Sequence, residues 1–414
     1  MERLPVRRVA AFGFLPVLAG IAPVLVIPAI AAQLGEQGWS AIAVGQSVGQ
    51  VGAILSAFAW PVIGPALVAG RPPEAQWREF SRSMRVRTLL FVISVIPLWW
   101  IATTLSPGVH SDAAGLSAIA FCAYGLGPGW YFVGVGQAGG VAAFETIPRL
   151  LSTLVAIAIL ILTGSQLAYP ACVLAGSLLG SIAAAWHLRR RRGTADSPEL
   201  TSKLPKPRSL WTQVSLTASG LVTSGYTVAS TAIVSAVAPG VSIVAAFAAV
   251  FRVQAMARIP PQTLATSLQG WVAEGRSPSQ RMKAALAWMI ALGLFGGACV
   301  ALLLPLILRI LFLGTVSTTP FVSLVCGLLV LAYSTSLSTS VHVLIPTGRA
   351  HLVAVATVLA SCVGVPLLLW LTPAYGVEGA MLALLIAEAL VVAIELPATV
   401  RIITRVAAEE ASEH

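Results

Sequence analysis

A long apolar run contains the polar stretch FRVQAMARIPPQ, which carries Arg252, Gln254 and Arg258 ahead of the pair Pro260-Pro261. A guanidinium at the centre of a membrane helix costs roughly 2.5–3.5 kcal/mol on insertion scales, so each arginine needs a partner or a function. The planar guanidinium can donate two hydrogen bonds to adjacent oxygens of a phosphate. The two prolines interrupt the helix and free carbonyls that a cavity or another helix must satisfy. We predict that Arg252, Arg258 and Gln254 face a water-filled cavity and bind an anionic headgroup.

A structural role is the alternative for the same two arginines. Either could form an ion pair, with Glu388 as the expected partner, and the Arg258 side chain could instead extend to the inner membrane interface. Glu388 and Glu395 are seven residues apart, so they share one face of a helix. Glu388 is either the partner of Arg252 or a carboxylate linked to proton or sodium transport. Glu395 is expected near the inner headgroups, in contact with solvent.

Further polar residues lie in the second and tenth apolar runs. Gln46 and Gln50 are one helical turn apart, and the tenth run is dense in hydroxyls, among them Ser336 and Thr339. These four residues are candidates for lining the cavity or for coupling transport to an ion. Hydroxyls in membrane helices more often join helices or bond to their own backbone, so packing is the alternative. His342, alone in this run, is expected to be a packing residue.

Composition identifies the elements that must hold these residues. Of the 414 residues, 57% are hydrophobic and 10% are charged, with a mean hydropathy of +0.89, whereas soluble domains contain about 25% charged residues. The chain is therefore predicted to be an all-α polytopic membrane protein, which excludes a soluble enzyme, a disordered protein and a single-span anchor. Catalytic motifs and metal-ligand spacings are absent from the sequence, and the five cysteines lie within apolar runs. We therefore expect no enzymatic activity, no cofactor and no metal site.

Charge alternates between the connections of the apolar runs. Lys and Arg gather in one set of connections, including Arg71–Arg87 and Arg189–Arg208, while the other set has none apart from Arg309 at a border. By the positive-inside rule the basic set is cytoplasmic, so both termini lie inside and the number of spans is even. Basic residues dispersed in this way are expected beside anionic lipid headgroups, not on nucleic acid. About twelve spans are predicted, near residues 10–33, 40–69, 88–105, 114–139, 150–164, 168–187, 210–237, 241–270, 284–308, 320–345, 352–371 and 376–399.

The longest polar interruption divides these spans into six and six. It predicts an N-terminal lobe over residues 1–188, a basic cytoplasmic linker over 189–208 and a C-terminal lobe over 209–414. Because each half has an even number of helices, a duplicated half keeps its orientation and gives a pseudo-two-fold axis along the membrane normal. Leu162–Gly180 and Leu371–Ala389 show a weak repeat at corresponding places. Two lobes around a central cavity are the predicted arrangement.

The first apolar run contains Pro16, Pro23 and Pro28. Each proline removes a backbone donor and permits a bend. The three together predict a moving gate, and a static kink fixed by packing is the alternative.

Three short motifs carry a resemblance to a transporter family: Leu34–Trp39 (LGEQGW), Gly129–Gly134 (GWYFVG) and Ala374–Ala380 (AYGVEGA). Together they resemble the O-antigen (Wzx-type) polysaccharide flippases of the multidrug/oligosaccharidyl-lipid/polysaccharide (MOP) exporter superfamily. The resemblance implies alternating access between two six-helix lobes. It also implies that a polyprenyl-pyrophosphate-linked oligosaccharide is flipped from the inner to the outer leaflet for surface polysaccharide biosynthesis. Arg252 lies where the eighth helix of the family commonly has a basic residue.

The same resemblance implies a location in the bacterial cytoplasmic membrane. The implied partners are membrane lipids, the polyprenyl-linked glycan and a glycan polymerase or glycosyltransferases. The sequence departs from the family in the seventh helix, where Tyr226, Ser230 and Thr231 occur in a region that is acidic in many relatives. This departure weakens the case for cation coupling.

Two other functions remain open. A cation-coupled small-molecule exporter of the multidrug type would favour a deep carboxylate in the first half, but Glu36, Asp112 and Glu145 are predicted at span ends. A membrane-embedded glycan-assembly protein without transport activity is disfavoured by the short outer loops. The sequence therefore favours an anionic cargo.

Overall fold

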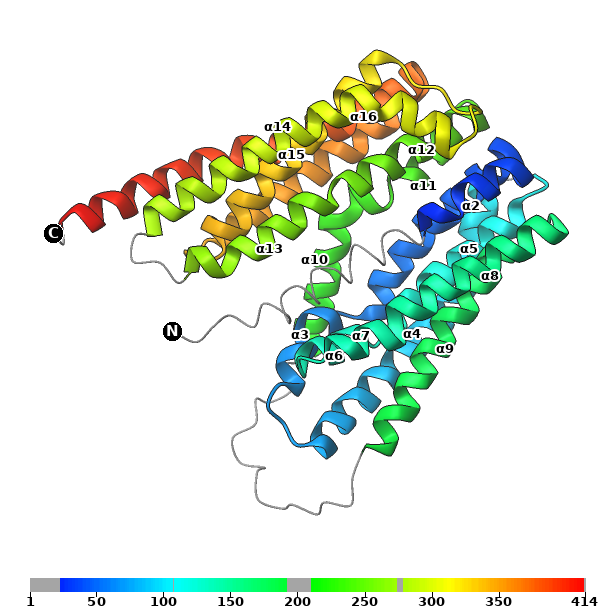
Figure 1. Cartoon of the computed structure of the whole chain (residues 1–414), viewed down its shortest axis with the longest axis horizontal. Helices are drawn as coiled ribbons and strands as arrows, with labels where there is room; N and C mark the ends of the chain where they lie inside the picture. The colour runs from blue at the N-terminus through cyan, green and yellow to red at the C-terminus, as the bar shows by residue number, and fades with distance from the viewer. Residues whose placement is uncertain (1–22, 107, 192–209, 274–277, 413–414) are drawn as a thin grey trace. The chain divides into compact units, whose positions relative to one another are not determined.

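The computed structural model describes residues 23–106, 108–191, 210–273 and 278–412 (Figure 1). Every element in these ranges is helical, which confirms the all-α prediction. The chain forms two compact units, Met1–Leu221 and Val222–His414, and each unit has its own helices.

The N-terminal unit is built around α2 and α5, which pack closely against each other. Small residues permit this approach, because a Cβ added at Gly45 would lie 2.1 Å from the Ala114 carbonyl oxygen and one at Gly49 would lie 2.4 Å from that of Ala118. The elements of this unit are α2 (Ile27–Ala57), α3 (Trp60–Val68), α4 (Pro73–Leu105), α5 (Ser111–Cys122), η1 (Ala123–Leu126), α6 (Gly129–Gly134), α7 (Ala138–Val141), η2 (Ala142–Thr146), α8 (Ile147–Thr163), α9 (Ala168–Arg190) and the first part of α10 (Leu210–Val228).

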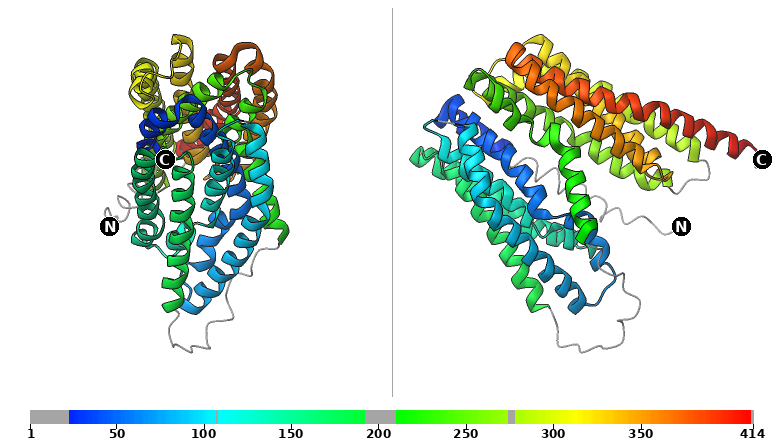
Figure 2. Two further views of the ribbon diagram at one scale, coloured as in Figure 1. Left: turned by 90° about the vertical axis from the view of Figure 1, so that its right-hand side faces the viewer. Right: turned by 180° about the vertical axis from the view of Figure 1, so that it is seen from behind.

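In the C-terminal unit, α14, α15 and α16 run side by side (Figure 1 and Figure 2). The closest approach of α14 and α15 involves two glycines, since a Cβ at Gly297 would lie 2.5 Å from the Gly327 carbonyl oxygen. The elements that follow α10 are α11 (Ser230–Val237), α12 (Val241–Ala257), α13 (Ile259–Ala273), α14 (Pro278–Leu311), α15 (Pro320–Ser338), η4 (Thr339–Leu344) and α16 (Ala350–Ser412).

Nine helical stretches among the described residues are long and apolar enough to cross a membrane. Two of them, Ile27–Val68 and Ala350–Glu410, are longer than a single crossing of about 20 residues needs. Each contains one glycine with a left-handed backbone, Gly35 (φ 62°) and Gly376 (φ 57°), at which the helix bends. Residues other than glycine strain at such an angle. The glycines of two of the three sequence motifs therefore form corners, and the number of twelve spans stays a prediction.

Two predicted spans are interrupted, in contrast to the continuous helices expected. Within 40–69, Phe58 and Ala59 both adopt positive φ, which separates α2 from α3. Within 114–139, α5 tightens into the 3₁₀ turn η1 and stops before α6. Prolines follow both breaks, Pro61 in the first turn of α3 and Pro128 at the N-cap of α6, where the missing donor is tolerated.

The predicted gate is described only in part, because Pro16 lies outside the described residues. Pro23 is helical, and Pro28 is the second residue of α2, which begins directly after the turn residue Val26. Val26 keeps an α-helical backbone (φ −83°, ψ −18°), so the interruption that the prolines predict stays a prediction. A gating role for Pro23 and Pro28 stays a prediction.

The boundary between the units lies inside α10. A Cβ at Gly220 would contact Ile54 of the N-terminal unit at 3.6 Å, and the Val222 carbonyl accepts a 2.6 Å hydrogen bond from Ser361 of the C-terminal unit. Only residues 189–191 of the predicted linker are described. The predicted limits of the two lobes, the pseudo-two-fold axis and the central cavity stay predictions.

Neighbouring glycines on α14 test the packing of α14 against α15. We expect Gly297→Ala to lower the stability of the protein by roughly 1–3 kcal/mol, because the new methyl group meets the Gly327 backbone. Gly296→Ala is the matched control: its Cβ meets only a Val330 methyl at 3.7 Å, and its better helix propensity is worth up to about 1 kcal/mol. Thermal unfolding in detergent measures both, and equal effects would contradict the close approach.

Candidate functional site

In the C-terminal unit, α12 and α16 are joined by an ion pair between Arg258 Nη2 and Glu388 Oε1, 3.1 Å apart. Arg258 is the residue between α12 and α13, two positions before Pro260-Pro261, and its guanidinium carbon lies 4.6 Å from the centre of the Tyr333 ring. The Tyr226 side chain interacts with the same carboxylate. Arg258 is therefore the ion-pair partner of Glu388. Such a pair is the structural alternative that the sequence left open.

The other two headgroup candidates lie on α12 itself. Arg252 is half-buried. Gln254 is 1% exposed, and both polar atoms of its amide lack a hydrogen-bond partner in the described part of the chain. The Arg258 Nε is also buried without a partner there. Buried polar atoms of this kind are rare and usually mark the place of a water, an ion or a ligand.

Seven residues beyond Glu388, the Glu395 side chain is fully buried, so the prediction of a solvated Glu395 is wrong. Its carboxylate lies within hydrogen-bond distance of three hydroxyls: Thr339 Oγ1 at 2.5 Å, Ser340 Oγ at 3.0 Å and Ser336 Oγ at 3.3 Å. The contacts exist because η4 follows α15 as a π-helical segment that brings Thr339 and Ser340 to one carboxylate. Two predicted lining residues, Ser336 and Thr339, therefore meet at Glu395.

His342 is a satisfied packing residue, as expected. Its Nδ1 lies 3.0 Å from the Ser338 hydroxyl, its Nε2 lies 3.0 Å from the Ala265 carbonyl oxygen, and the side chain is 1% exposed. The ring joins η4 to α13 and has no atom left for a ligand.

In the N-terminal unit, Arg87 is 1% exposed and lies in a helix, whereas the sequence analysis placed it in a connection; its side of the membrane stays a prediction. The chain is helical from Pro73, and Arg87 lies well inside α4. Its guanidinium donates to the carbonyl oxygens of Gly125 (2.8 Å from Nε) and Gly127 (2.8 Å from Nη2) and to the Ser83 hydroxyl (3.4 Å). These two carbonyls are available because the helix stops at η1, which explains how the membrane tolerates the charge.

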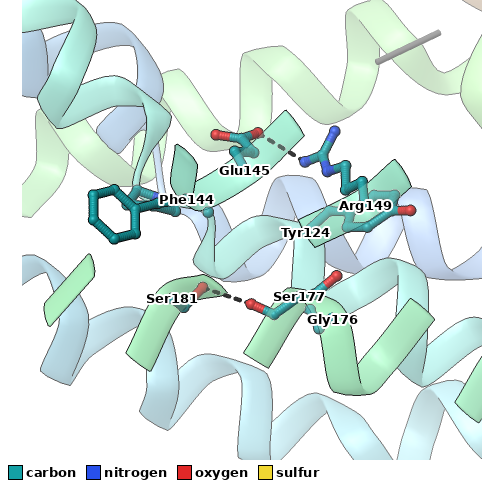
Figure 3. Close-up of a pocket in the computed structure, with 10 residues that line it drawn as sticks. Tyr124, Phe144, Glu145, Arg149, Gly176, Ser177 and Ser181 are labelled. Atoms are coloured by element: carbon teal, nitrogen blue, oxygen red, sulfur yellow. Dashed lines mark hydrogen bonds and ion pairs between the residues drawn. The ribbon is translucent and has the colours of Figure 1, made fainter. Parts of the chain in front are cut away.

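A second charged group of this unit surrounds Glu145. The Glu145 carboxylate binds the Arg149 guanidinium at 2.7 Å, and that guanidinium lies 4.1 Å above the Tyr124 ring (Figure 3). Glu145 belongs to the π-helical segment η2, inside the membrane-length stretch Ala138–Thr163. Glu145 is the eighth residue of this stretch, and its predicted place at a span end stays a prediction. A Cβ at Gly129 would lie 2.2 Å from Glu145 Oε2, so only glycine leaves room for the carboxylate.

A cavity of about 330 Å³ lies beside these groups. Arg87, Tyr124, Glu145 and Trp130 line it, together with three glycines and two prolines. The Trp130 indole nitrogen is buried without a hydrogen-bond partner among the described residues. On the other side of Glu145, a space of about 10 Å³ faces Ser177 and Ser181, enough for one water (Figure 3). The sequence signal for this site is the glycine- and proline-rich stretch Gly125–Gly129 before Trp130, of which only Gly129 belongs to a motif named above.

The remaining candidates of the sequence analysis also belong to the N-terminal unit. Gln46 is 2% exposed and donates to the Tyr169 hydroxyl at 3.3 Å, which joins α2 to α9. Gln50 is half-buried. A cavity shared with Arg252 and Glu388 stays a prediction, because those residues belong to the other unit. Within the ranges that the structure describes, no three His, Cys, Asp or Glu side chains gather as metal ligands would.

No family model matches the chain, and no curated protein matches it. Solved structures match its fold. A crystal structure of MATE in the bent conformation aligns over 98% of this chain and 97% of that chain, with a TM-score of 0.60 and 14% identity. An inward-facing multidrug resistance MATE family transporter of the MOP superfamily aligns over 95% and 94%, with a TM-score of 0.57 and 14% identity.

A third solved structure is a MOP superfamily transporter from Pyrococcus furiosus, for which a binding pocket of reversed polarity suggests a different function. It aligns over 96% of both chains with a TM-score of 0.53 and 16% identity. The chain therefore has the fold of MATE transporters of the MOP superfamily. It is a multi-pass helical membrane protein.

Replacing Arg87 tests the hydrogen bonds of its guanidinium to the carbonyls at the end of η1. We expect Arg87→Met to lower stability by about 2–4 kcal/mol, because the Gly125 and Gly127 carbonyls lose a buried donor. Arg82→Met, on the exposed side of the same helix, is the control and should stay within about 0.5 kcal/mol of the unmodified chain. Unfolding in detergent, followed by circular dichroism, separates the two; matching curves would argue against the Arg87 contacts.

Proposed function

We propose that the chain is a transporter that flips a polyprenyl-pyrophosphate-linked oligosaccharide from the inner to the outer leaflet of a bacterial cytoplasmic membrane. Transport by alternating access is supported by the fold, since solved structures with this fold are described as inward-facing and as outward-facing. At 14–15% identity these structures speak for the architecture alone. The cargo must be inferred from the polar residues of this chain.

The observation that carries the proposal is a pair of unpartnered polar groups in the stretch Arg252–Arg258. The Gln254 amide and the Arg258 Nε are buried without hydrogen-bond partners in the described ranges. They belong to one short stretch, which also carries two guanidiniums. Donors that remain unpaired cost about 1–3 kcal/mol each. An occupant with several acceptor oxygens, such as a pyrophosphate, would remove that cost.

The charges of the buried groups also favour an anion. Glu145 is paired with Arg149 and Glu388 with Arg258, so these carboxylates are neutralised within the protein. Arg87 donates to neutral carbonyls and a hydroxyl, and no carboxylate of the described chain lies within ion-pair distance of it. A surplus of positive charge beside a cavity of about 330 Å³ suits a phosphate-bearing headgroup. The lipid tail of such a cargo can stay in the bilayer.

Export of a small molecule is the second candidate, and two observations favour it. Two of the solved structures of this fold are described as multidrug resistance transporters. The half-buried carboxylate of Glu145 also lines the cavity of the N-terminal unit, where an organic cation could displace Arg149. The Pyrococcus furiosus transporter, described as having a pocket of reversed polarity, indicates that one fold serves cargoes of different charge.

The two functions predict different effects of gene deletion. A flippase mutant should accumulate lipid-linked oligosaccharide on the inner leaflet and lose surface polymer. The partners proposed from the family resemblance, a glycan polymerase or glycosyltransferases, would then act before and after this step. Normal surface polymer together with a gain in drug sensitivity would establish the exporter instead. Loss of surface polymer without accumulation of the lipid-linked oligosaccharide on the inner leaflet would favour a glycan-assembly protein without transport activity.

Arg252→Gln tests the headgroup role directly. A hydrogen bond to a charged group contributes about 1.5–3 kcal/mol, so flipping of a fluorescent polyprenyl-pyrophosphate oligosaccharide in proteoliposomes should fall roughly 10- to 150-fold. Arg309→Gln, at the exposed end of α14, is the control and should flip normally. Undiminished flipping by Arg252→Gln at normal abundance would remove this residue from the proposal.

A double-mutant cycle separates the two roles of Arg258. Each single change, Arg258→Gln or Glu388→Gln, leaves a buried partner and should lower stability by about 3–5 kcal/mol, whereas the double variant should lose much less than the sum. If Arg258 also binds the headgroup, the stable double variant still fails to flip the cargo. Recovery of flipping in the double variant would make Arg258 purely structural.

A further inference from the structure

A groove of about 560 Å³ lies along α4 in the N-terminal unit. It shares no lining residue with the cavity beside Glu145. The residues that line it include Trp77, Ser81, Arg85, Leu89 and Val92 of α4 and Ala185 of α9. Those of α4 recur every three or four positions, so they share one side of the helix. The rise from Trp77 to Val92 is about 22 Å.

The half of the groove that follows Arg85 is mostly apolar and exposed. Leu89 is 60% exposed and Val92 is 59% exposed. Both lie in the stretch Pro73–Leu105, which is long and apolar enough to cross a membrane. The rise from Arg85 to Val92 is about 10 Å, and the hydrocarbon layer of one leaflet is about 15 Å thick. This half of the groove therefore has the length and the surface to hold an acyl chain.

The other half of the groove presents polar donors. Arg85 is exposed, and its Nε makes a long contact of 3.5 Å with the Ser81 carbonyl oxygen. None of the ion pairs among the described residues includes Arg85. The hydroxyl of Ser81 is shielded from solvent and has no hydrogen-bond partner in the described part of the chain. Because Ser81 precedes Arg85 by about one helical turn, the hydroxyl and the guanidinium lie on the same side of α4.

These two groups together suit a phosphate. The planar guanidinium of Arg85 can donate two hydrogen bonds to adjacent oxygens, and the Ser81 hydroxyl can donate one more. A shielded hydroxyl without a partner is rare, and it usually marks the place of an acceptor that the protein itself does not supply. A positive charge without a counter-charge, placed at the start of an apolar groove, is complementary to a lipid with an anionic headgroup.

Helix α9 carries residues of the membrane interface beside the same groove. Trp186 directly follows Ala185 and is 56% exposed, and the guanidinium carbon of Arg190 lies 3.5 Å from the centre of the Trp186 rings. Tryptophan is enriched at the level of the headgroups. The arginines of α4 and α9 are predicted on the cytoplasmic side, where anionic lipids give the leaflet a negative surface.

We propose that this groove is a binding site for one anionic phospholipid of the cytoplasmic leaflet. The phosphate binds Arg85 and Ser81, and one acyl chain lies along Leu89 and Val92. Because Ala185 of α9 also lines the groove, the bound lipid contacts both helices.

The phospholipid is distinct from the proposed cargo, and the site does not rest on that cargo. Arg87 lies about 200° further round α4 than Arg85. It is 1% exposed and bonds inside the unit, whereas Arg85 is exposed. The two arginines thus serve opposite sides of one helix, and the groove lies on the side away from the cavity that Arg87 lines.

Native mass spectrometry of the purified chain in detergent measures the binding of single lipids. We expect phosphatidylglycerol to bind about 10-fold more tightly than phosphatidylcholine with the same acyl chains. In Arg85→Gln this preference should be lost, because the charged partner of the phosphate is gone. Arg82→Gln, at an exposed position of the same helix outside the groove lining, is the matched control. It should lose at most about fivefold, the contribution of any basic residue at an anionic surface.

A second variant tests the apolar half of the groove. Thr88 lines the groove at an exposed position, so Thr88→Trp fills the groove without changing a charge or the core. Binding of phosphatidylglycerol should fall roughly 10-fold, since each CH₂ that loses its contact contributes about fourfold. Ile96→Trp, at a 78% exposed position of α4 outside the groove lining, is the control and should bind the lipid normally.

Equal affinity of the unmodified chain for the two lipids would overturn the proposal, and so would equal losses in Arg85→Gln and Arg82→Gln. Normal binding to Thr88→Trp would leave a charge contact at the membrane surface and refute the groove. Displacement of the lipid by inorganic phosphate would identify a site for free phosphate, and tighter binding of a polyprenyl pyrophosphate would make the groove part of the cargo route. A dimer that excludes the lipid would assign the groove to a second copy. Lipid selectivity without flipping activity would leave the site intact and refute only the proposed cargo.

Discussion

The cost of placing a charged side chain where no water can reach it governs the interior of this protein. The described cases show three kinds of solution. Arg87 is surrounded by backbone carbonyls, Glu145 and Glu388 have guanidinium partners, and Glu395 is surrounded by hydroxyls. A bilayer supplies none of these partners, so each must come from a neighbouring helix. The charges therefore fix which helices must meet, in addition to the apolar contacts that fill the space between them.

Interruptions of the helices provide many of these partners. The end of η1 frees the two carbonyls that Arg87 binds, and the π-helical segments η2 and η4 carry Glu145 and the hydroxyls around Glu395. Arg258 itself lies at the junction of α12 and α13. In an uninterrupted helix the backbone N–H and C=O groups bond to each other, so none is free to bond a charged side chain. Breaks and charges thus occur together because each removes the cost of the other.

The fold class followed from hydropathy, since apolar runs of membrane length leave few other structures. The corners at Gly35 and Gly376 lie in motifs that the sequence had singled out, and the Arg258–Glu388 pair was one of its open alternatives. How deeply a charged side chain is buried was not predictable in the same way. Helices α4 and α16 continue well beyond their apolar cores, so counting from the end of an apolar run placed Arg87 and Glu395 too close to water. Partners far apart in sequence, such as Arg87 and Gly125, are visible only once the helices are packed.

The same physics explains how one fold can serve different cargoes. The close helix contacts depend on small residues against backbone, as at Gly297 and Gly327, and such contacts are indifferent to the charge of the pocket. Low identity with retained architecture, 14–16% over nearly the whole chain, is what this separation allows. Cargo preference then depends on the few polar groups whose charges are left uncompensated inside the protein. Here Glu145 and Glu388 are paired with arginines of the same unit. The guanidinium of Arg87 and the unpartnered groups Gln254 and Arg258 Nε are the observations on which we base the proposal of an anionic cargo.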